Sequence, residues 1–224
     1  MKPDSADTAP RLALKWRFAR VMMNRRFATQ LARMALDGYL AEVGWTRSVL
    51  DQSIVGRDGS AIPWATYSFI EFIGPRLGKN FNVFEYGAGA STSYYAKRVS
   101  KVIALEHDSV FAAMLRPKLP ANVELRERPL GPGYINAIAE LREPPSLVSV
   151  DGRNRVACVE AARGCLASDG VIVLDDTERP DYEPACEALK KHGFKRLDFW
   201  GFAPGQVERR CTTVFYRSEN VLGL

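Results

Sequence analysis

Two acidic residues and a glycine turn lie close together in the middle of the chain. Glu85 ends a short apolar run and is followed by Gly87-Ala88-Gly89, and Glu106 ends a second apolar run, 19 residues after Gly87. Glycine has no Cβ, so the backbone of this turn can bend sharply and approach a ligand closely. An acid at this distance after the turn is placed to accept hydrogen bonds from ribose hydroxyls. The spacing therefore indicates a nucleotide-type ligand.

The elements that must position these residues form one β-α-β unit. The apolar runs Phe81–Tyr86 and Val102–Leu105 predict two parallel strands, and a helix is expected between them, from Ser91 or Thr92 to about Arg98. Serine and threonine are favourable N-cap residues, because their side-chain oxygens accept hydrogen bonds from free N–H groups of the first helical turn. In such units the ligand binds at the carboxyl ends of the strands.

The residues around the turn distinguish between two ligand classes. A dinucleotide requires a small residue at the third glycine position, whereas Thr92 is branched, and Glu85 is unfavourable beside a pyrophosphate. The pattern E-Y-G-A-G-A-S-T instead resembles the first motif of the class I, Rossmann-like S-adenosylmethionine-dependent methyltransferases. The resemblance extends from about Val83 to Tyr216. It implies an α/β fold with a seven-stranded sheet of order 3-2-1-4-5-7-6, S-adenosyl-L-methionine as cofactor, and methyltransferase activity.

The resemblance also implies which residues bind the cofactor. In that family the acid before the glycines lies near the cationic methionyl end, and the acid that ends the second strand binds the ribose. These positions match Glu85 and Glu106 of this sequence. The other expected cofactor-binding residues are Gly87, Ala88, Gly89, Ser91, Thr92, His107 and Asp151.

Three further acids follow two apolar runs that are predicted to be neighbouring strands. Asp151 follows Leu147–Val150, and Asp175 and Asp176 follow Val171–Leu174. Because the carboxyl ends of adjacent parallel strands meet in one crevice, we expect these acids to lie close together. Like charges at short range raise the pKa of each carboxyl unless a cation lies among them.

Two kinds of cation are compatible with these acids. One is a divalent metal such as Mg²⁺ or Mn²⁺, which prefers carboxylate oxygens, held by Asp151, Asp175 and Asp176. The other is a guanidinium group, from Arg153, Arg155 or Arg179.

Two resemblances bear on this choice. The stretch V-L-D-D-T is similar to the D-N-T of the catechol and caffeoyl-CoA O-methyltransferases, in which these residues and an earlier Asp hold a metal. Asp176 replaces the Asn of that motif, and Arg153-Asn154-Arg155 stands where those enzymes have a lysine base, which arginine cannot replace at neutral pH. The stretch V-D-G-R-N-R also resembles a looser methyltransferase group that includes enzymes methylating uronic-acid sugars. An arginine pair there suits an acceptor with a carboxylate or phosphate.

These features favour O-methylation of a small-molecule or glycan hydroxyl. Asp151, or a metal held by the three acids, is expected to take or acidify the hydroxyl proton, with Arg153 and Arg155 as the other catalytic candidates. Asp151 has the alternative of capping the helix that follows it. Two other functions stay open, namely a non-catalytic scaffold with the same fold and an NAD-dependent oxidoreductase.

Three aromatic residues are candidates for the wall of the pocket. Trp64 precedes, and Tyr67 lies in, a helix predicted over residues 65–77, and in the resembled family a helix at this place often covers the cofactor and part of the substrate pocket. Tyr134 follows the third predicted strand, where it could stack on an adenine. Each has the alternative of packing in the core.

The N-terminal part of the chain differs from the rest in charge. Residues 1–10 are expected to be disordered, residues 11–63 to form a basic helical extension and loop, and residues 64–224 to form the methyltransferase domain. Residues 11–36 contain seven basic residues and no acid, whereas the net charge of the whole chain is only +5. The predicted catalytic part is thus nearly neutral, which argues against a nucleic acid as partner.

The apolar residues of the basic segment fall on one side of a helical wheel. At 100° per residue, they lie within about a quarter of the wheel, and most arginines lie elsewhere; they are Trp16, Met23, Phe27, Leu31 and Met34. Three interpretations follow, in which the helix packs on its own domain, forms a contact in a homo-oligomer, or lies on an anionic membrane surface.

Composition is that of a globular protein. The chain of 224 residues is 46% hydrophobic and 25% charged, and no uninterrupted apolar run approaches the length of a membrane span. The N-terminus lacks the apolar core of a secretory signal, and the four cysteines show no metal-binding spacing. The expected location is the cytoplasm, at the membrane periphery if the basic helix binds lipid.

Overall fold

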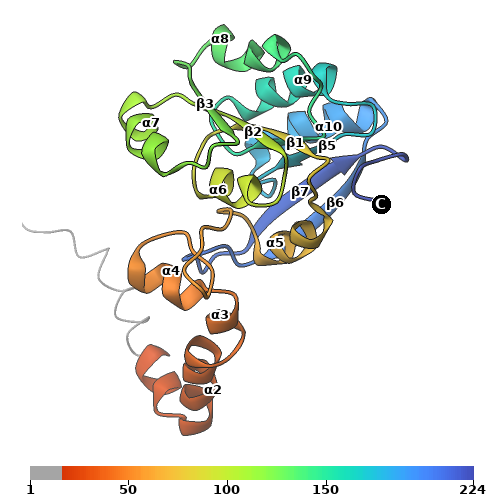
Figure 1. Ribbon diagram of the computed structural model, residues 1–224. Helices are drawn as coiled ribbons and strands as arrows, with labels where there is room; N and C mark the ends of the chain where they lie inside the picture. Colours follow the sequence, from red (N-terminus) through yellow and green to blue (C-terminus); the bar gives the residue numbers. More distant parts are fainter. Residues whose placement is uncertain (1–16) are drawn as a thin grey trace, which may run out of the picture.

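Seven strands form one sheet in the order β3-β2-β1-β4-β5-β7-β6 within residues 17–224, which are the residues that the computed structural model describes (Figure 1). This order confirms the fold class expected from the sequence. The tail expected at residues 1–10, the first residues of the basic segment and Trp16 lie outside the described residues. The strands are β1 Asn82–Tyr86, β2 Lys101–Glu106, β3 Val123–Glu127, β4 Leu147–Val150, β5 Val171–Leu174, β6 Lys195–Gly201 and β7 Arg210–Tyr216.

The first five strands are parallel, and β7 runs antiparallel between β5 and β6. All residues of β4 and β5 are buried, because helices cover both faces of the parallel part of the sheet. Strands β6 and β7 follow each other without an intervening helix, which confirms the antiparallel pair expected at the sheet edge.

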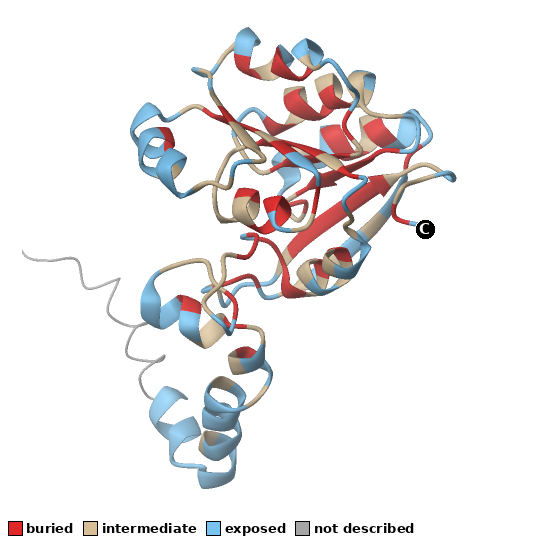
Figure 2. Ribbon diagram, in the orientation of Figure 1, coloured by how far each residue is buried: buried red, intermediate tan, exposed pale blue. Residues whose placement is uncertain are grey.

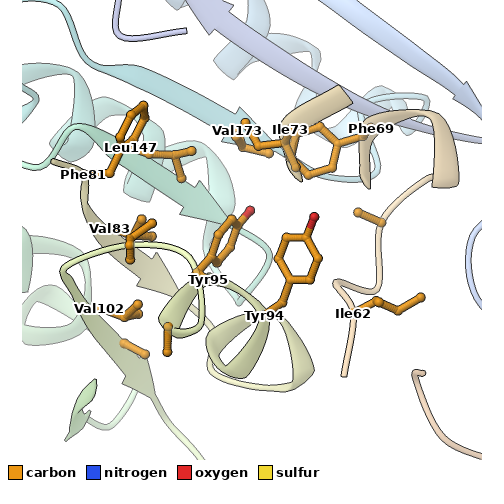
Figure 3. Packing of buried hydrophobic residues seen from close by; sticks show 14 of the residues in the cluster. Ile62, Phe69, Ile73, Phe81, Val83, Tyr94, Tyr95, Val102, Leu147 and Val173 are labelled. Carbon is orange, nitrogen blue, oxygen red and sulfur yellow. The ribbon is translucent and has the colours of Figure 1, made fainter. Parts of the chain in front are cut away.

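Alternate residues of each strand enter two hydrophobic cores, one on each face of the sheet. Val83 packs with Tyr95 and Phe69 on the face covered by helices α5, α6 and α7 (Figure 3), whereas Phe84 packs with Cys158 and Leu189 on the face covered by α8, α9 and α10. The helices are α5 Tyr67–Ile73, α6 Ala90–Ala96, α7 Ser109–Leu115, α8 Pro132–Ile135, α9 Arg155–Cys165 and α10 Glu183–Lys191, joined in places by 3₁₀ turns.

Helix α6 begins earlier than the sequence predicts. Its N-cap is Gly89, so Ser91 and Thr92 lie inside the first turn and neither is the N-cap. Oγ1 of Thr92 accepts a hydrogen bond from the N–H of Gly89 at 3.0 Å. Thr92 therefore fixes the start of the helix from within, which the N-cap rule alone does not anticipate.

The N-terminal extension is a series of short helices. Residues 17–22 are helical, and α2 Arg25–Leu36, α3 Tyr39–Glu42 and α4 Trp45–Asp51 follow. Asn24 separates the first two, since its Oδ1 accepts a hydrogen bond from the N–H of Phe27 at 3.1 Å. None of the helices in residues 17–224 is long and apolar enough to cross a bilayer.

The extension is attached to the α/β domain through α4 and not through α2. Nε1 of Trp45 donates a hydrogen bond of 2.7 Å to the carbonyl of Gln206, in the loop between β6 and β7. Helix α2 has no buried residue, and it lies away from the sheet (Figure 2). The interpretation that this helix packs its apolar side on its own domain is therefore wrong. The start of the methyltransferase domain at residue 64 is not tested by these contacts and stays a prediction.

Candidate functional site

A cleft of about 510 Å³ lies at the carboxyl ends of β1, β2, β4 and β5. Most of the residues expected to bind the cofactor contribute to its wall, namely Gly87, Ala88, Gly89, Ser91, Glu106, His107 and Asp151. Arg153, Arg155, Asp175 and Asp176 lie on the same wall. Glu85 and Thr92 are the two expected site residues that do not line the cleft.

Position 87 requires a glycine for two reasons, namely its backbone conformation and the close approach of a neighbouring loop. Its φ is +97°, which favours glycine, and a Cβ at this position would lie 2.8 Å from the Cα and N of Gly152. The turn after β1 and the turn after β4 thus pack backbone against backbone. This close approach holds the two loops of the cleft together.

Gly89 leaves open space where a side chain would stand. No atom lies within 4 Å of the Cβ position that another residue would have there. A ligand can therefore lie against the backbone of the turn, as the sequence predicts for this glycine.

Glu106 combines a fixed orientation with a free oxygen. Its Oε1 accepts hydrogen bonds from the backbone N–H of His107 at 2.7 Å and of Asp108 at 2.8 Å. Its Oε2 makes no hydrogen bond within residues 17–224, although the residue is only 5% exposed. This oxygen is available to the hydroxyls of a ligand in the cleft. The imidazole of His107 lies beside the other carboxylate oxygen of Glu106, with its Nδ1 2.8 Å from Oε1.

Glu85 lies beneath the glycine turn and not on the wall of the cleft. It is 1% exposed, and its Oε2 has no hydrogen-bond partner in the part of the chain that the structure describes. Burial raises the pKa of this carboxyl to about 7, with a further contribution from the charge of Asp151, although the hydroxyls of Thr92 and Ser91 favour its ionised form. Glu85 therefore does not line the cleft, and its role in binding the cofactor stays a prediction.

Arg155 joins the loops that follow β4 and β5. Its Nη2 donates to Oδ1 of Asp151 at 2.7 Å and its Nη1 donates to the carbonyl of Asp175 at 2.7 Å. Its Nε donates to the carbonyl of Gly152 at 3.1 Å, and Nη1 also lies 3.3 Å from Oδ2 of Asp176. All three guanidinium nitrogens are thus engaged inside the protein. No nitrogen of this guanidinium is left free for an acceptor, and the expected role of Arg155 in binding one stays a prediction.

Asp176 is surrounded by guanidinium groups. The side chain is buried, and Arg179 lies 2.7 Å from its Oδ2, with Arg155 at 3.3 Å from the same oxygen and Arg210 at 3.4 Å from Oδ1. Of the two cations compatible with these acids, the structure thus places arginine beside them.

The expected metal set of Asp151, Asp175 and Asp176 is not supported. Within residues 17–224, no group of three or more His, Cys, Asp or Glu residues is arranged to hold a metal ion. Oxygens of two of the three acids point to arginine, and Oδ1 of Asp175 accepts a hydrogen bond from Thr212 at 2.5 Å.

The carboxyl of Asp151 has a raised pKa, which makes it more basic than an ordinary aspartate. Burial raises the pKa of its carboxyl to about 6; the charge of Arg155 opposes this shift, and the charge of Asp176 adds to it. Its side chain is 36% exposed at the cleft, so water moderates the effect until a ligand fills the space. Asp151 does not cap helix α9, whose N-cap is Asn154. The pKa of Asp175 is also raised, by burial and then by the charges of Asp151 and Asp176.

The aromatic candidates divide between the cleft and the core. Trp64 lines the cleft and is half exposed, whereas Tyr67 is buried. Tyr134 is fully buried, and its hydroxyl lies against Gly152 beneath the turn. Stacking of Tyr134 on an adenine is therefore wrong for this structure.

Sequence reasoning missed the contribution of the last strand pair. Gln206 and Arg210 line the cleft, and Nε of Arg210 donates to Oε1 of Gln206 at 2.7 Å. The sequence did contain a signal for this contribution. A strand that runs antiparallel beside β5 must begin near the carboxyl end of β5, which is the edge of the sheet where the cleft lies. Thr213 pairs with Leu174, the last residue of β5, which places the start of β7 at the cleft.

No protein-family model and no curated protein sequence matches the chain. Among solved structures, it is similar to a precorrin-6y C5,15-methyltransferase from Geobacter metallireducens, with a TM-score of 0.57 and 19% identity over 68% of this chain and 88% of that one. An O-methyltransferase from Bacillus cereus in complex with SAH gives 0.55 and 18% identity over 66% and 78% of the two chains. An rRNA methylase from Streptococcus thermophilus gives 0.52 and 15% over 66% and 93%.

At these identities the likeness concerns the fold, and the names of the three proteins indicate different methyl acceptors. Strand order, the position of the glycine turn and these similarities agree with one another. The chain therefore has the Rossmann-like fold of the class I S-adenosylmethionine-dependent methyltransferases.

Proposed function

We propose that this protein is an S-adenosylmethionine-dependent methyltransferase that methylates a hydroxyl group of a small molecule or a glycan. One observation carries the proposal. In a methyltransferase fold, the open backbone at Gly89 and the free Oε2 of Glu106 face the same cleft.

The residues present fit this cofactor. Glu106 would accept hydrogen bonds from the ribose hydroxyls, while Ala88, Gly89, Ser91 and His107 would line the cofactor. Beneath the turn, the buried carboxyl of Glu85 has an unpartnered oxygen, and its negative form favours a cationic ligand above it. When bound, S-adenosylmethionine supplies a methyl group on a cationic sulfur, which is reactive toward oxygen nucleophiles.

Asp151 would accept the proton of the acceptor hydroxyl. Its Oδ1 is held by Arg155, and its Oδ2 makes no hydrogen bond within residues 17–224. In the transfer, the acceptor oxygen would bond to the methyl carbon, the carbon–sulfur bond would break with its electron pair left on sulfur, and Asp151 would take the hydroxyl proton. A pKa of about 6 leaves Asp151 mostly ionised at neutral pH and still basic enough to take the proton.

Arg153 would bind an anionic group of the acceptor. It lines the cleft, it is exposed, and its side chain has no ion-pair partner in the described part of the chain. Arg155, Arg179 and Arg210 are each paired with acids. A single free guanidinium suits one carboxylate or phosphate, whereas a polynucleotide requires several free cations, so we favour a small acceptor over a nucleic acid.

Calorimetric titration with S-adenosylhomocysteine tests the cofactor assignment. We expect binding to the wild-type chain and at least tenfold weaker binding to Glu106→Gln, because the amide replaces a charged hydrogen-bond acceptor. The matched control is Glu127→Gln, since Glu127 pairs with Glu106 in the sheet register but is exposed and lies outside the cleft wall.

Three outcomes discriminate between the candidate functions. Absence of S-adenosylhomocysteine binding at millimolar ligand would contradict the proposal, and binding of NAD in its place would favour an oxidoreductase. Cofactor binding without methyl transfer to any hydroxyl, carboxylate or phosphate-bearing compound tested would favour a non-catalytic scaffold.

A further inference from the structure

An apolar surface of the N-terminal extension is exposed to solvent. Helix α2 has no buried residue, and Phe27, Leu31 and Met34 are each at least 40% exposed. Phe18, in the helical segment of residues 17–22, and Met23, at the break before α2, are even more exposed. Single exposed apolar residues are ordinary, but a group of this size marks a binding surface.

The apolar residues of α2 form a stripe. Phe27, Leu31 and Met34 have the i, i+4, i+7 spacing that places side chains on one side of a helix. At 100° per residue, Arg25 lies nearly opposite this stripe, and Arg26 and Arg33 lie together at its flank. The helix has twelve residues and is thus about 18 Å long.

The charge around this stripe is predominantly positive. Five arginines and no acid occur in residues 17–36. Arg33 has a partner in Asp37, at 3.8 Å and with both side chains about two-thirds exposed, so this pair is weak. Arg25 and Arg26 have no ion-pair partner among the described residues.

We propose that the helix of residues 17–22 and α2 together form a docking surface for an anionic lipid membrane. The apolar stripe would enter the boundary between headgroups and acyl chains, and the arginines would bind lipid phosphates through their paired N–H groups. An amphipathic helix with a basic polar side lies in the plane of such a surface and does not cross it.

Charge complementarity favours lipid over a second copy of this chain as the occupant. A two-fold symmetric contact would place the same arginine-rich surface against itself. Residues 17–36 contain no acid that could neutralise the partner's arginines. An anionic membrane has the opposite charge and therefore attracts the surface as a whole.

Co-sedimentation of the full chain with lipid vesicles tests the proposal. We expect binding to vesicles of phosphatidylcholine with about one-third phosphatidylglycerol at low salt, weaker binding at high salt, and little binding to pure phosphatidylcholine. Arg25→Gln with Arg26→Gln should reduce partitioning about 30-fold, and Phe27→Glu with Leu31→Glu should abolish it.

The chain offers matched controls for both double variants. Lys190 and Lys191 are an adjacent, exposed cation pair at the end of α10, and their change to Gln should leave partitioning unaltered. Val110 and Met114 are exposed and four residues apart on α7, so their change to Glu introduces the same two negative charges on another helix. Unchanged melting temperatures would show that each variant is folded.

The proposal would be overturned by equal partitioning of the Phe27→Glu/Leu31→Glu variant and the wild type, or by no binding to anionic vesicles at low salt. Light scattering supplies the competing outcome. A wild-type dimer that these two changes convert to a monomer, together with no vesicle binding, would assign the surface to a second copy of the chain.

Discussion

Gly87 and Gly152 lie backbone against backbone at the base of the cleft. A Cβ on Gly87 would come within 2.8 Å of the N and Cα of Gly152, and a Cβ on Gly152 would come within 2.9 Å of the carbonyl oxygen of Tyr86. These glycines hold two loops together, whereas Gly89, two residues along the turn, has open space on its side-chain side. One glycine motif thus serves two separate purposes.

Alanine substitutions should separate these purposes. Gly87→Ala should lower the free energy of unfolding by about 1–3 kcal/mol, because it forces both a positive φ and a backbone contact on a residue with a Cβ. Gly89→Ala should leave the free energy of unfolding nearly unchanged and weaken S-adenosylhomocysteine binding. Urea unfolding and calorimetry measure the two quantities. A stable Gly87→Ala chain would show that the two loops can move apart.

The sheet order was expected from the resemblance to the methyltransferases, and the location of the cleft from local patterns in the sequence. Apolar runs of strand length, a glycine turn and acids at strand ends repeat along the chain, and each is a local pattern. The carboxyl ends of β1, β2, β4 and β5 are therefore predictable without knowledge of any contact between them.

The roles of the arginines were not predictable in the same way. Arg153 and Arg155 are two residues apart, yet one is exposed at the cleft and the other is buried with its nitrogens engaged. This difference depends on the loop after β5, which lies about twenty residues further along the chain. The same holds for Glu85, because whether an acid lies on a cleft wall or beneath it depends on the start of the following helix.

The proposed role of Asp151 predicts a pH dependence. The base must be ionised, so kcat/KM for methyl transfer should fall as the pH decreases through about 6, the pKa to which burial raises this carboxyl. Asp151→Asn should lower kcat by about 10²–10⁴-fold and retain S-adenosylhomocysteine binding, because the amide has a similar shape but cannot take the proton.

Asp169→Asn is the control for this change, since Asp169 is exposed and lies outside the cleft wall. An Asp151→Asn enzyme with wild-type kcat and an unaltered pH profile would assign the proton to another group or to water.

The buried carboxyl of Glu85 predicts a cost in stability that depends on pH. Below pH 4.5 the group is protonated in both the folded and the unfolded chain and contributes nothing. As the pH rises from 4.5 to about 7, the unfolded chain releases this proton first, because the folded-state pKa is raised to about 7, so the free energy of unfolding decreases. Above pH 7 the loss is complete, at about 3 kcal/mol.

Glu85→Gln should therefore stabilise the ligand-free protein at pH 8 and have little effect near pH 4.5, as measured by urea unfolding at both values. The same substitution should weaken the binding of S-adenosylmethionine more than that of S-adenosylhomocysteine. Only S-adenosylmethionine carries a positively charged sulfur, and the substitution removes the negative charge that favours it. Glu127→Gln, at an exposed position, should change neither quantity. Equal weakening of both ligands would show that Glu85 acts on the shape of the turn and not through its charge.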